Sequence, residues 1–258
     1  MPRFAANLTM LFTEAPFLAR FDAAARAGFR AVEFVSPYEH PAEEVARAAR
    51  DAGVETVLFN LPPGDWAKGD RGMACDPSRT AELREGVERA LAYAGALGCA
   101  RLHLMAGIRP AGVPETALRE SYLAALRLAG RALDARGIAL LVEGINGRDM
   151  PGYYLQTSRQ AFELMDAAGV PNLHYQYDVY HMQIMEGDLA ATIERRIERI
   201  GHVQIADPPA RNEPGTGEVS FPFLFRLLDR IGYRGWVGCE YRPRAGTLAG
   251  LSWMDPWR

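Results

Sequence analysis

Four oxygen-bearing side chains, Glu143, Asp178, Gln204 and Glu240, lie at the carboxyl ends of predicted β-strands and are separated by 35, 26 and 36 residues. Each interval is close to one strand–helix–strand step, so the four residues would lie at the ends of consecutive strands. Three carboxylates and an amide oxygen that converge would repel one another unless a cation lay between them. Oxygen ligands favour a hard ion, Mg²⁺ or Mn²⁺, over zinc. Any one of these residues alone is as readily a solvated strand-end group, and only their shared spacing predicts a metal site.

The elements that would position these side chains alternate between strand and helix along the chain. Apolar and β-branched runs predict eight strands, and apolar residues at helical spacing predict seven helices between them. The predicted strands are Phe4–Leu8, Ala31–Phe34, Val54–Asn60, Arg101–Met105, Ile138–Val142, Leu173–Asp178, His202–Ile205 and Trp236–Glu240. The predicted helices cover residues 17–27, 42–52, 78–97, 115–136, 157–168, 188–199 and 221–231.

This alternation indicates parallel βαβ units with right-handed crossovers. Eight such units close most naturally into a (β/α)8 TIM barrel, whose strand ends converge at one mouth. The main alternative is an open doubly wound sheet, but Asn7-Leu-Thr-Met-Leu follows the first strand in place of the G-x-G-x-x-G of a dinucleotide site. We therefore predict a single TIM-barrel domain over residues 1–258, with an irregular tail at 241–258.

Cationic and imidazole side chains lie in the predicted loops near this mouth. His181 comes just after the sixth strand, close enough to contact a substrate, although a structural histidine that caps the loop fits the sequence equally well. Arg211 lies in the Pro/Gly loop after the seventh strand, and a guanidinium can hold a carboxylate with two hydrogen bonds. Lys68 and Arg71 lie in the long loop after the third strand. Each cation alone is more often a surface charge; Arg211 is the preferred candidate for binding a substrate carboxylate, and Lys68 and Arg71 are further candidates.

Composition excludes several classes of protein. The net charge is −3, so no domain-wide basic surface is available to bind nucleic acid. No apolar run approaches the roughly 18 residues of a membrane span, and the first residues do not form a secretion signal. Three widely spaced cysteines fit reduced thiols in a cytoplasmic protein. The predicted partner is a small molecule, with neither nucleic acid nor membrane, and a homo-oligomer is left open.

The sequence resembles a known family, the xylose-isomerase-like TIM barrels, and within it the branch that acts on hydroxypyruvate. The likeness runs nearly end to end, and the motif around Gln204 is the most specific. In the wider family the sugar epimerases carry histidine where this chain has Gln204, which argues against a sugar-epimerase substrate preference. The motifs that carry the resemblance are Asn60-Leu-Pro-Pro-Gly-Asp-Trp, Glu143-Gly-Ile-Asn, Tyr177-Asp-Val-Tyr-His-Met-Gln, Gly201-His-Val-Gln-Ile-Ala-Asp-Pro-Pro-Ala-Arg-Asn-Glu-Pro-Gly-Thr-Gly-Glu and Gly238-Cys-Glu-Tyr.

The resemblance implies reversible conversion of hydroxypyruvate to tartronate semialdehyde through an enediolate. A divalent metal, Mg²⁺ or Mn²⁺, would stabilise the enediolate, and Glu143 and Glu240 would exchange protons with the substrate as acid and base. Asp178 and Gln204 would complete the metal site. The alternatives are an isomerase of a longer keto acid such as a 2-oxo-tetronate, or a ketose 3-epimerase on the same site. A non-catalytic sugar-acid binder and, from another class, a metal-dependent nuclease of the endonuclease IV type fit the sequence less well, the nuclease because such sites gather many histidines and this chain has five.

Overall fold

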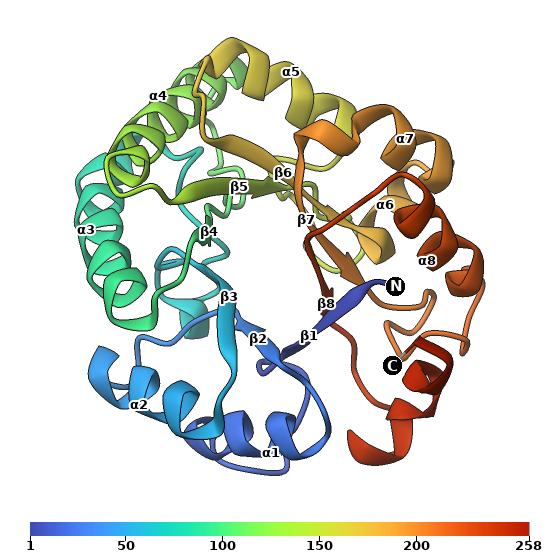
Figure 1. Ribbon diagram of the computed structural model, residues 1–258. Coiled ribbons are helices and arrows are strands. Elements are labelled where there is room, and N and C mark those ends of the chain that lie inside the picture. The colour runs from blue at the N-terminus through green and yellow to red at the C-terminus, as the bar shows by residue number, and fades with distance from the viewer. Residues whose placement is uncertain (258) are drawn as a thin grey trace.

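The computed structural model describes residues 1–257, and in it eight parallel strands form one closed barrel (Figure 1). Each strand pairs with the next along the chain, and the first pairs with the last, so no strand edge is left open. The predicted TIM barrel is therefore confirmed. The strands are β1 (Arg3–Asn7), β2 (Ala31–Phe34), β3 (Glu55–Asn60), β4 (Arg101–His103), β5 (Ala139–Glu143), β6 (Leu173–Asp178), β7 (Ile200–Ile205) and β8 (Trp236–Cys239).

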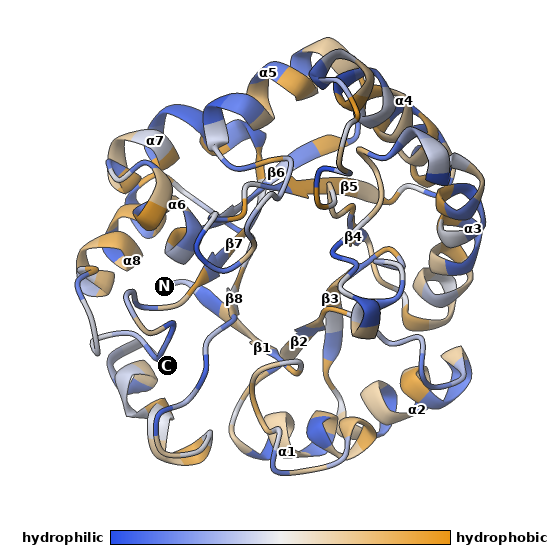
Figure 2. Cartoon of the chain, turned by 180° about the vertical axis from the view of Figure 1, so that it is seen from behind, coloured by the Kyte–Doolittle hydropathy of each residue, from blue (hydrophilic) through white to orange (hydrophobic). Residues whose placement is uncertain are grey.

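The described residues form eight α-helices, most of which make an outer ring around the strands, whereas the short α6 lies inside that ring beside β6 and β7 (Figure 1). Figure 2 shows hydrophilic and hydrophobic residues alternating along these helices, as expected where one face packs on the barrel and the other meets solvent. No helix in the described part of the chain is long and apolar enough to cross a membrane. The helices are α1 (Arg20–Arg26), α2 (Ala42–Ala52), α3 (Thr80–Leu97), α4 (Glu115–Asp134), α5 (Ser158–Ala168), α6 (Val179–Met185), α7 (Leu189–Arg196) and α8 (Phe221–Arg230).

Local signals explain how individual helices begin and end. The α2 helix buries Val45, Ala46 and Ala49 on one face, and it ends at Gly53, whose φ of 68° is a left-handed conformation that glycine adopts without steric cost. The α5 helix begins after Thr157, whose hydroxyl accepts the backbone N–H of Gln160. Such signals made most helix boundaries predictable to within about two residues.

The segment after β6 differs from the prediction. The sequence predicted a loop from the end of β6 to a helix over residues 188–199, whereas the structure has the short helix α6 directly after the strand and then α7. The carboxylate of Asp178 accepts the backbone N–H of Tyr180 and thereby caps α6 at its first turn. A helix of 7 residues is too short to produce a clear apolar period, so only its cap marked it in the sequence.

Alternation along the strands stacks two layers of side chains inside the barrel. A small apolar cluster contains Ala5, Ala31, Leu58 and Leu141, which come from four different strands. Two residues further along each of these strands is a buried polar residue, because side chains two apart on a strand point the same way. These polar residues are Asn7, Glu33, Asn60 and Glu143. The apolar layer therefore closes the barrel beneath a polar layer at its carboxyl-terminal mouth.

The tail is more regular than the sequence predicted. Residues Leu248–Trp257 form a 3-10 helix, and only the stretch from 241 to 247 lacks regular structure. Trp253 packs edge-on against Phe4 at 5.1 Å between ring centroids, and its indole N–H donates to the hydroxyl of Tyr241. The ring of Phe225, on α8, lies 5.8 Å from that of Trp253. The tail thus packs against both α8 and the first strand, β1.

We expect Trp253→Ala to lower the free energy of unfolding by about 3 kcal/mol, because it removes a half-buried aromatic ring from this contact. Urea unfolding followed by circular dichroism would measure the change. Trp66→Ala is the matched control, since Trp66 is 43% exposed and its removal should change stability little. Equal losses in the two variants would contradict a stabilising role for the tail.

Candidate active site and metal centre

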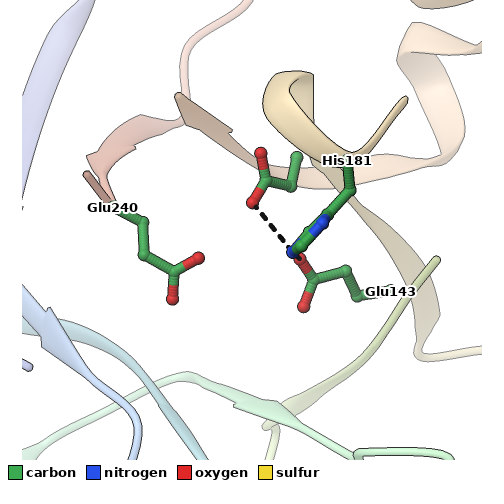
Figure 3. A group of neighbouring side chains, drawn as sticks. Glu143, His181 and Glu240 are labelled. Atoms are coloured by element: carbon green, nitrogen blue, oxygen red, sulfur yellow. Dashed lines mark ion pairs between the residues drawn. The ribbon is translucent and has the colours of Figure 1, made fainter. Parts of the chain in front are cut away.

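The barrel mouth brings together carboxylates from three strands. Glu143 ends β5, Asp178 ends β6, and Glu240 directly follows β8. With His181 of α6 they form a buried group in which one ligand atom of each residue lies within 4.8 Å of the others. Figure 3 shows Glu143, His181 and Glu240 pointing toward a common centre. The strand ends singled out in the sequence therefore lie at one place.

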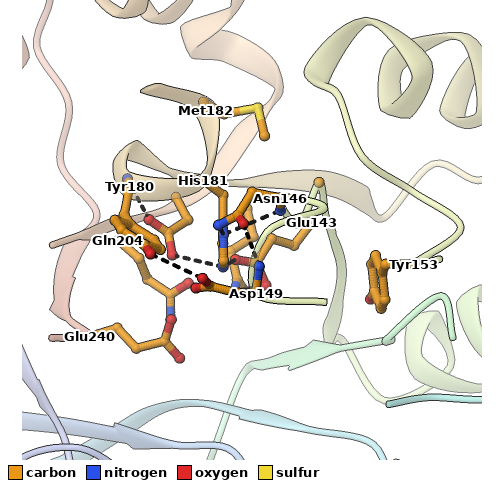
Figure 4. A network of polar contacts seen from close by, with 12 residues as sticks. Glu143, Asn146, Asp149, Tyr153, Tyr180, His181, Met182, Gln204 and Glu240 are labelled. Carbon is orange, nitrogen blue, oxygen red and sulfur yellow. Dashed lines mark hydrogen bonds and ion pairs between the residues drawn. The ribbon is translucent and has the colours of Figure 1, made fainter. Parts of the chain in front are cut away.

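Gln204 joins this group through hydrogen bonds rather than through charge. Its side chain points inward from β7, where its Nε2 donates to Glu33 Oε1 at 2.7 Å. The Oε1 of Gln204 accepts a hydrogen bond from Gln176 Nε2 at 2.6 Å. Gln176 Nε2 also donates to Glu143 Oε2 at 3.0 Å. Figure 4 places Gln204 between Glu240 and the group around His181. Gln204 is thus linked to Glu143 through Gln176, and its amide oxygen faces Gln176.

Burial and mutual repulsion make the carboxylates unusually weak acids. Burial raises the pKa of Glu143 well above its ordinary value, and the charges of Glu240 and Asp178 raise it further. Burial raises the pKa of Glu240 to about 8, against the opposing effect of Arg211. The pKa of Asp178 is also raised by burial, with Arg211 again opposing. Without added positive charge, this group would hold protons at neutral pH.

Arg211 supplies one positive charge. Its Nη2 lies 2.6 Å from Glu240 Oε2 and 3.6 Å from Asp178 Oδ2, and its Nη1 lies 3.4 Å from Asp149 Oδ2. The side chain is buried and lies over the ring of Tyr180. One guanidinium facing four carboxylates, Glu143 included, leaves net negative charge at the mouth.

The Arg211 loop is shaped by hydrogen bonds from its own backbone. The buried carboxylate of Asp207 accepts the backbone N–H groups of Gly215, Gly217 and Val219. Arg211 itself has a φ of 58°, a conformation that few residues other than glycine adopt. The loop is therefore held in the shape that turns Arg211 into the mouth.

Two carboxylate oxygens at this centre lack a hydrogen-bond donor. Glu143 Oε1 and Asp178 Oδ2 are buried, and neither accepts a hydrogen bond within the described residues. A buried anionic oxygen without a donor is costly, and a hard divalent cation would satisfy both atoms. Together with Glu240 and the oxygen of Gln204 they form an all-oxygen donor set. That set fits Mg²⁺ or Mn²⁺.

The hydrogen bonds of His181 fix which ring nitrogen carries its proton. The backbone N–H and the side-chain Nδ2 of Asn146 both donate to His181 Nδ1, at 3.3 and 2.6 Å. The side-chain amide of Asn146 is oriented by its own Oδ1, which accepts the backbone N–H of Asp149. Burial lowers the pKa of His181 well below its ordinary value, so the ring is neutral. The proton of a neutral ring must then be on Nε2, which lies 3.6 Å from Asp178 Oδ2 and 3.8 Å from Glu143 Oε1. His181 therefore presents a donor to the centre, as a substrate-binding residue would, rather than a metal-binding lone pair.

Lys68 and Arg71 occupy a different environment. The side chain of Lys68 is 83% exposed and pairs with Asp65 at 2.9 Å. Arg71 lies over the ring of Trp66 and donates to backbone oxygens of Trp66 and Asp70. Across residues 1–257, no hydrogen bond or ion pair joins either side chain to the buried group.

Sequence reasoning missed the polar residues that the first four strands and β6 contribute to the mouth. A cavity of about 20 Å³ lies among them, lined also by Glu143, Gln204 and Glu240. The signal for these residues in the sequence is a polar residue inside or at the end of an apolar strand, as in Ala31-Val-Glu-Phe. Burial lowers the pKa of His103 to about 3, so its ring is neutral beside Glu143. The missed residues are Asn7, Glu33, Asn60, His103 and Gln176.

The raised pKa of Glu240 predicts a pH effect on stability. In the metal-stripped protein the folded state keeps this proton up to about pH 8, whereas an unfolded glutamate releases it near pH 4.5. The folded state thus binds more protons in between, so the free energy of unfolding should fall as pH rises from about 5 to 8, by up to about 1.4 kcal/mol per pH unit. Glu240→Gln should flatten the fall in urea unfolding series, while the exposed Glu120→Gln should not. A wild-type curve that rises over this window would contradict the assignment.

Comparisons with known proteins agree with this geometry. The sequence profile of the Xylose isomerase-like TIM barrel family matches residues 21–257. A 2-oxo-tetronate isomerase from Cupriavidus necator is 52% identical, covering 100% of this chain and 99% of its own, and a hydroxypyruvate isomerase from Escherichia coli K12 is 49% identical over the whole of both chains. A crystal structure from Brucella melitensis, described as AP endonuclease, family 2, superposes with a TM-score of 0.97 at 48% identity over 100% of both chains. The chain belongs to the xylose isomerase-like TIM barrel family.

Proposed function

We propose that this protein is a divalent-metal-dependent isomerase that interconverts hydroxypyruvate and tartronate semialdehyde through an enediolate. The observation that carries the proposal is the group of buried carboxylates at the barrel mouth, with two oxygens that lack a donor. Enzymes with this fold carry their chemistry at this end of the barrel. The names of the relatives from Cupriavidus necator and Escherichia coli support an isomerase of small keto acids.

Glu143, Asp178, Gln204 and Glu240 would hold the metal, Mg²⁺ or Mn²⁺. When bound, the ion supplies positive charge that stabilises the negative charge on the substrate oxygens. Glu143 and Glu240 would then move protons: one takes a proton from the hydroxyl-bearing carbon, and the other returns a proton to the neighbouring carbon. The proton of the substrate hydroxyl passes to the former carbonyl oxygen, so that the old hydroxyl becomes the new carbonyl.

Four further residues would bind the substrate. The Nε2–H of His181 faces the centre and would donate a hydrogen bond to a substrate oxygen. The guanidinium of Arg211 would hold the carboxylate, with Lys68 and Arg71 as contributors from the loop after β3. Because Arg211 also contacts Glu240, it would place the substrate carboxylate beside one of the two acid–base groups.

The first test is an assay of EDTA-treated protein on hydroxypyruvate, followed by addition of Mg²⁺ or Mn²⁺. We expect the treated protein to be inactive and the ion to restore turnover. Glu143→Gln and Glu240→Gln should each lower kcat by about 10²–10⁴-fold with the ion present, the range for lost acid–base catalysis. Circular dichroism would confirm that the variants fold. Turnover that survives EDTA and both substitutions would rule out this site.

A 2-oxo-tetronate is the second candidate substrate, favoured by the name of the relative that is 52% identical. The two keto acids differ by one carbon, and both offer a carboxylate beside a carbonyl. The ratio of their kcat/KM values with the metal-loaded protein decides between them. The same preparation should be tested on a free ketose for 3-epimerase activity, and on abasic DNA for nuclease activity; turnover of DNA alone would overturn an isomerase assignment.

The role of Arg211 can be separated from its contact with Glu240. Dihydroxyacetone resembles hydroxypyruvate but lacks the carboxylate, so the ratio of kcat/KM for the two compounds isolates carboxylate binding. We expect Arg211→Ala to lower this ratio by about 10–100-fold, the effect of losing a hydrogen bond between charged groups. An unchanged ratio would remove Arg211 from substrate binding. Lys68→Ala and Arg71→Ala, measured in the same way, test the contribution of their loop.

A further inference from the structure

Glu33 is a fully buried carboxylate that the proposed reaction does not use. It lies in β2, lines the cavity inside the barrel, and has none of its surface exposed. Its Oε2 lies 2.6 Å from His202 Nε2, and its Oε1 accepts from Asn7 Nδ2 at 3.0 Å and from Gln204 Nε2 at 2.7 Å. Gly238 faces it from β8, and a Cβ there would overlap the carboxylate. Glu33 is therefore held in one position on several sides.

A carboxylate in this position dictates which way the neighbouring amides point. A carboxylate oxygen accepts hydrogen bonds, so Gln204 turns its NH₂ group toward Glu33 Oε1 and its own oxygen away. That oxygen accepts from Gln176 Nε2, so Gln176 must likewise turn its NH₂ group toward Gln204. The same nitrogen donates to Glu143. One acceptor on β2 thus sets the direction of a hydrogen-bond chain that crosses β7 and β6 and ends on β5.

We propose that Glu33 is a positioning residue that makes Gln204 present its amide oxygen, and not its NH₂ group, to the metal site. The proposal rests on the proposed function, because only there does Gln204 act as a ligand. A glutamine amide has two ends of nearly equal size, and the NH₂ end would repel a cation. A carboxylate ligand, whose two oxygens are equivalent, would not need this control over its two ends, so the dependence on Glu33 follows from having glutamine at this position.

The first experiment needs no metal. Amide NMR of the metal-free protein should show the Gln204 Nε2 protons protected from solvent exchange, with a scalar coupling through the hydrogen bond to the Glu33 carboxylate carbon. The resonance is assigned by its absence in Gln204→Leu. Glu33→Met, which removes the acceptor at similar length, should abolish the protection, whereas Glu33→Gln, which keeps an acceptor oxygen, should retain it. Absence of the coupling in the wild-type protein would overturn the proposal, whether or not a variant folds.

The second experiment measures Mn²⁺ affinity by titration calorimetry with manganese chloride. Glu33→Gln and Glu33→Met both remove the negative charge, so their difference reports the acceptor alone. We expect Glu33→Gln to bind nearly as the wild type does and Glu33→Met to bind roughly 10–100-fold more weakly, the usual effect of losing a group that orients a ligand. In a Gln204→Leu background, Glu33→Met should cause no further loss, because both changes remove the same interaction.

The outcomes separate this inference from the proposed function. Equal binding by Glu33→Gln and Glu33→Met, or losses that add in the double variant, would overturn the role of Glu33 while leaving the metal site intact. Failure of the wild-type protein to bind Mn²⁺ would overturn the metal-dependent function, and the NMR measurement would still decide whether Glu33 orients Gln204.

Discussion

The repulsion among buried carboxylates at the barrel mouth is the interaction on which the rest of the site depends. Glu143, Asp178 and Glu240 come from separate strands, so each strand must hold its carboxylate in place against the others. A closed barrel can do this because every strand is bonded on both sides and cannot move away. The fold thereby holds an arrangement of charge that a flexible loop would relax.

That arrangement explains the neutral polar groups around it. Hydrogen-bond donors such as the Nε2–H of His181 and the amide of Gln176 face the carboxylates, and Arg211 contributes full positive charge. None of them cancels the negative charge completely. The centre therefore favours cations, and a bound cation would supply the positive charge that the proposed enediolate needs.

Much of this could be predicted from the sequence, because the main signals were periodic. The strand–helix alternation predicted the barrel, and the intervals between the strand-end residues placed Glu143, Asp178 and Glu240 near one another. The helix α6 was missed because it is shorter than the window in which an apolar period can be recognised. Glu33 was missed for a different reason: a single charged residue in a strand shows its meaning only when its partners on β1 and β7 are known. Nor could sequence show that Lys68 would pair with its neighbour Asp65.

The two hydrogen-bond systems at this site differ in how they can be lost during evolution. The direction of the Gln204 amide depends on the side chain of Glu33, so a single codon change can alter it. The proton position on His181 depends partly on the main-chain N–H of Asn146, which every residue except proline retains. The histidine tautomer is therefore inherited with the path of the backbone, whereas the direction of the amide at Gln204 is open to drift. Among related proteins, we would therefore expect a change in substrate or metal preference to begin with substitutions at or around Glu33.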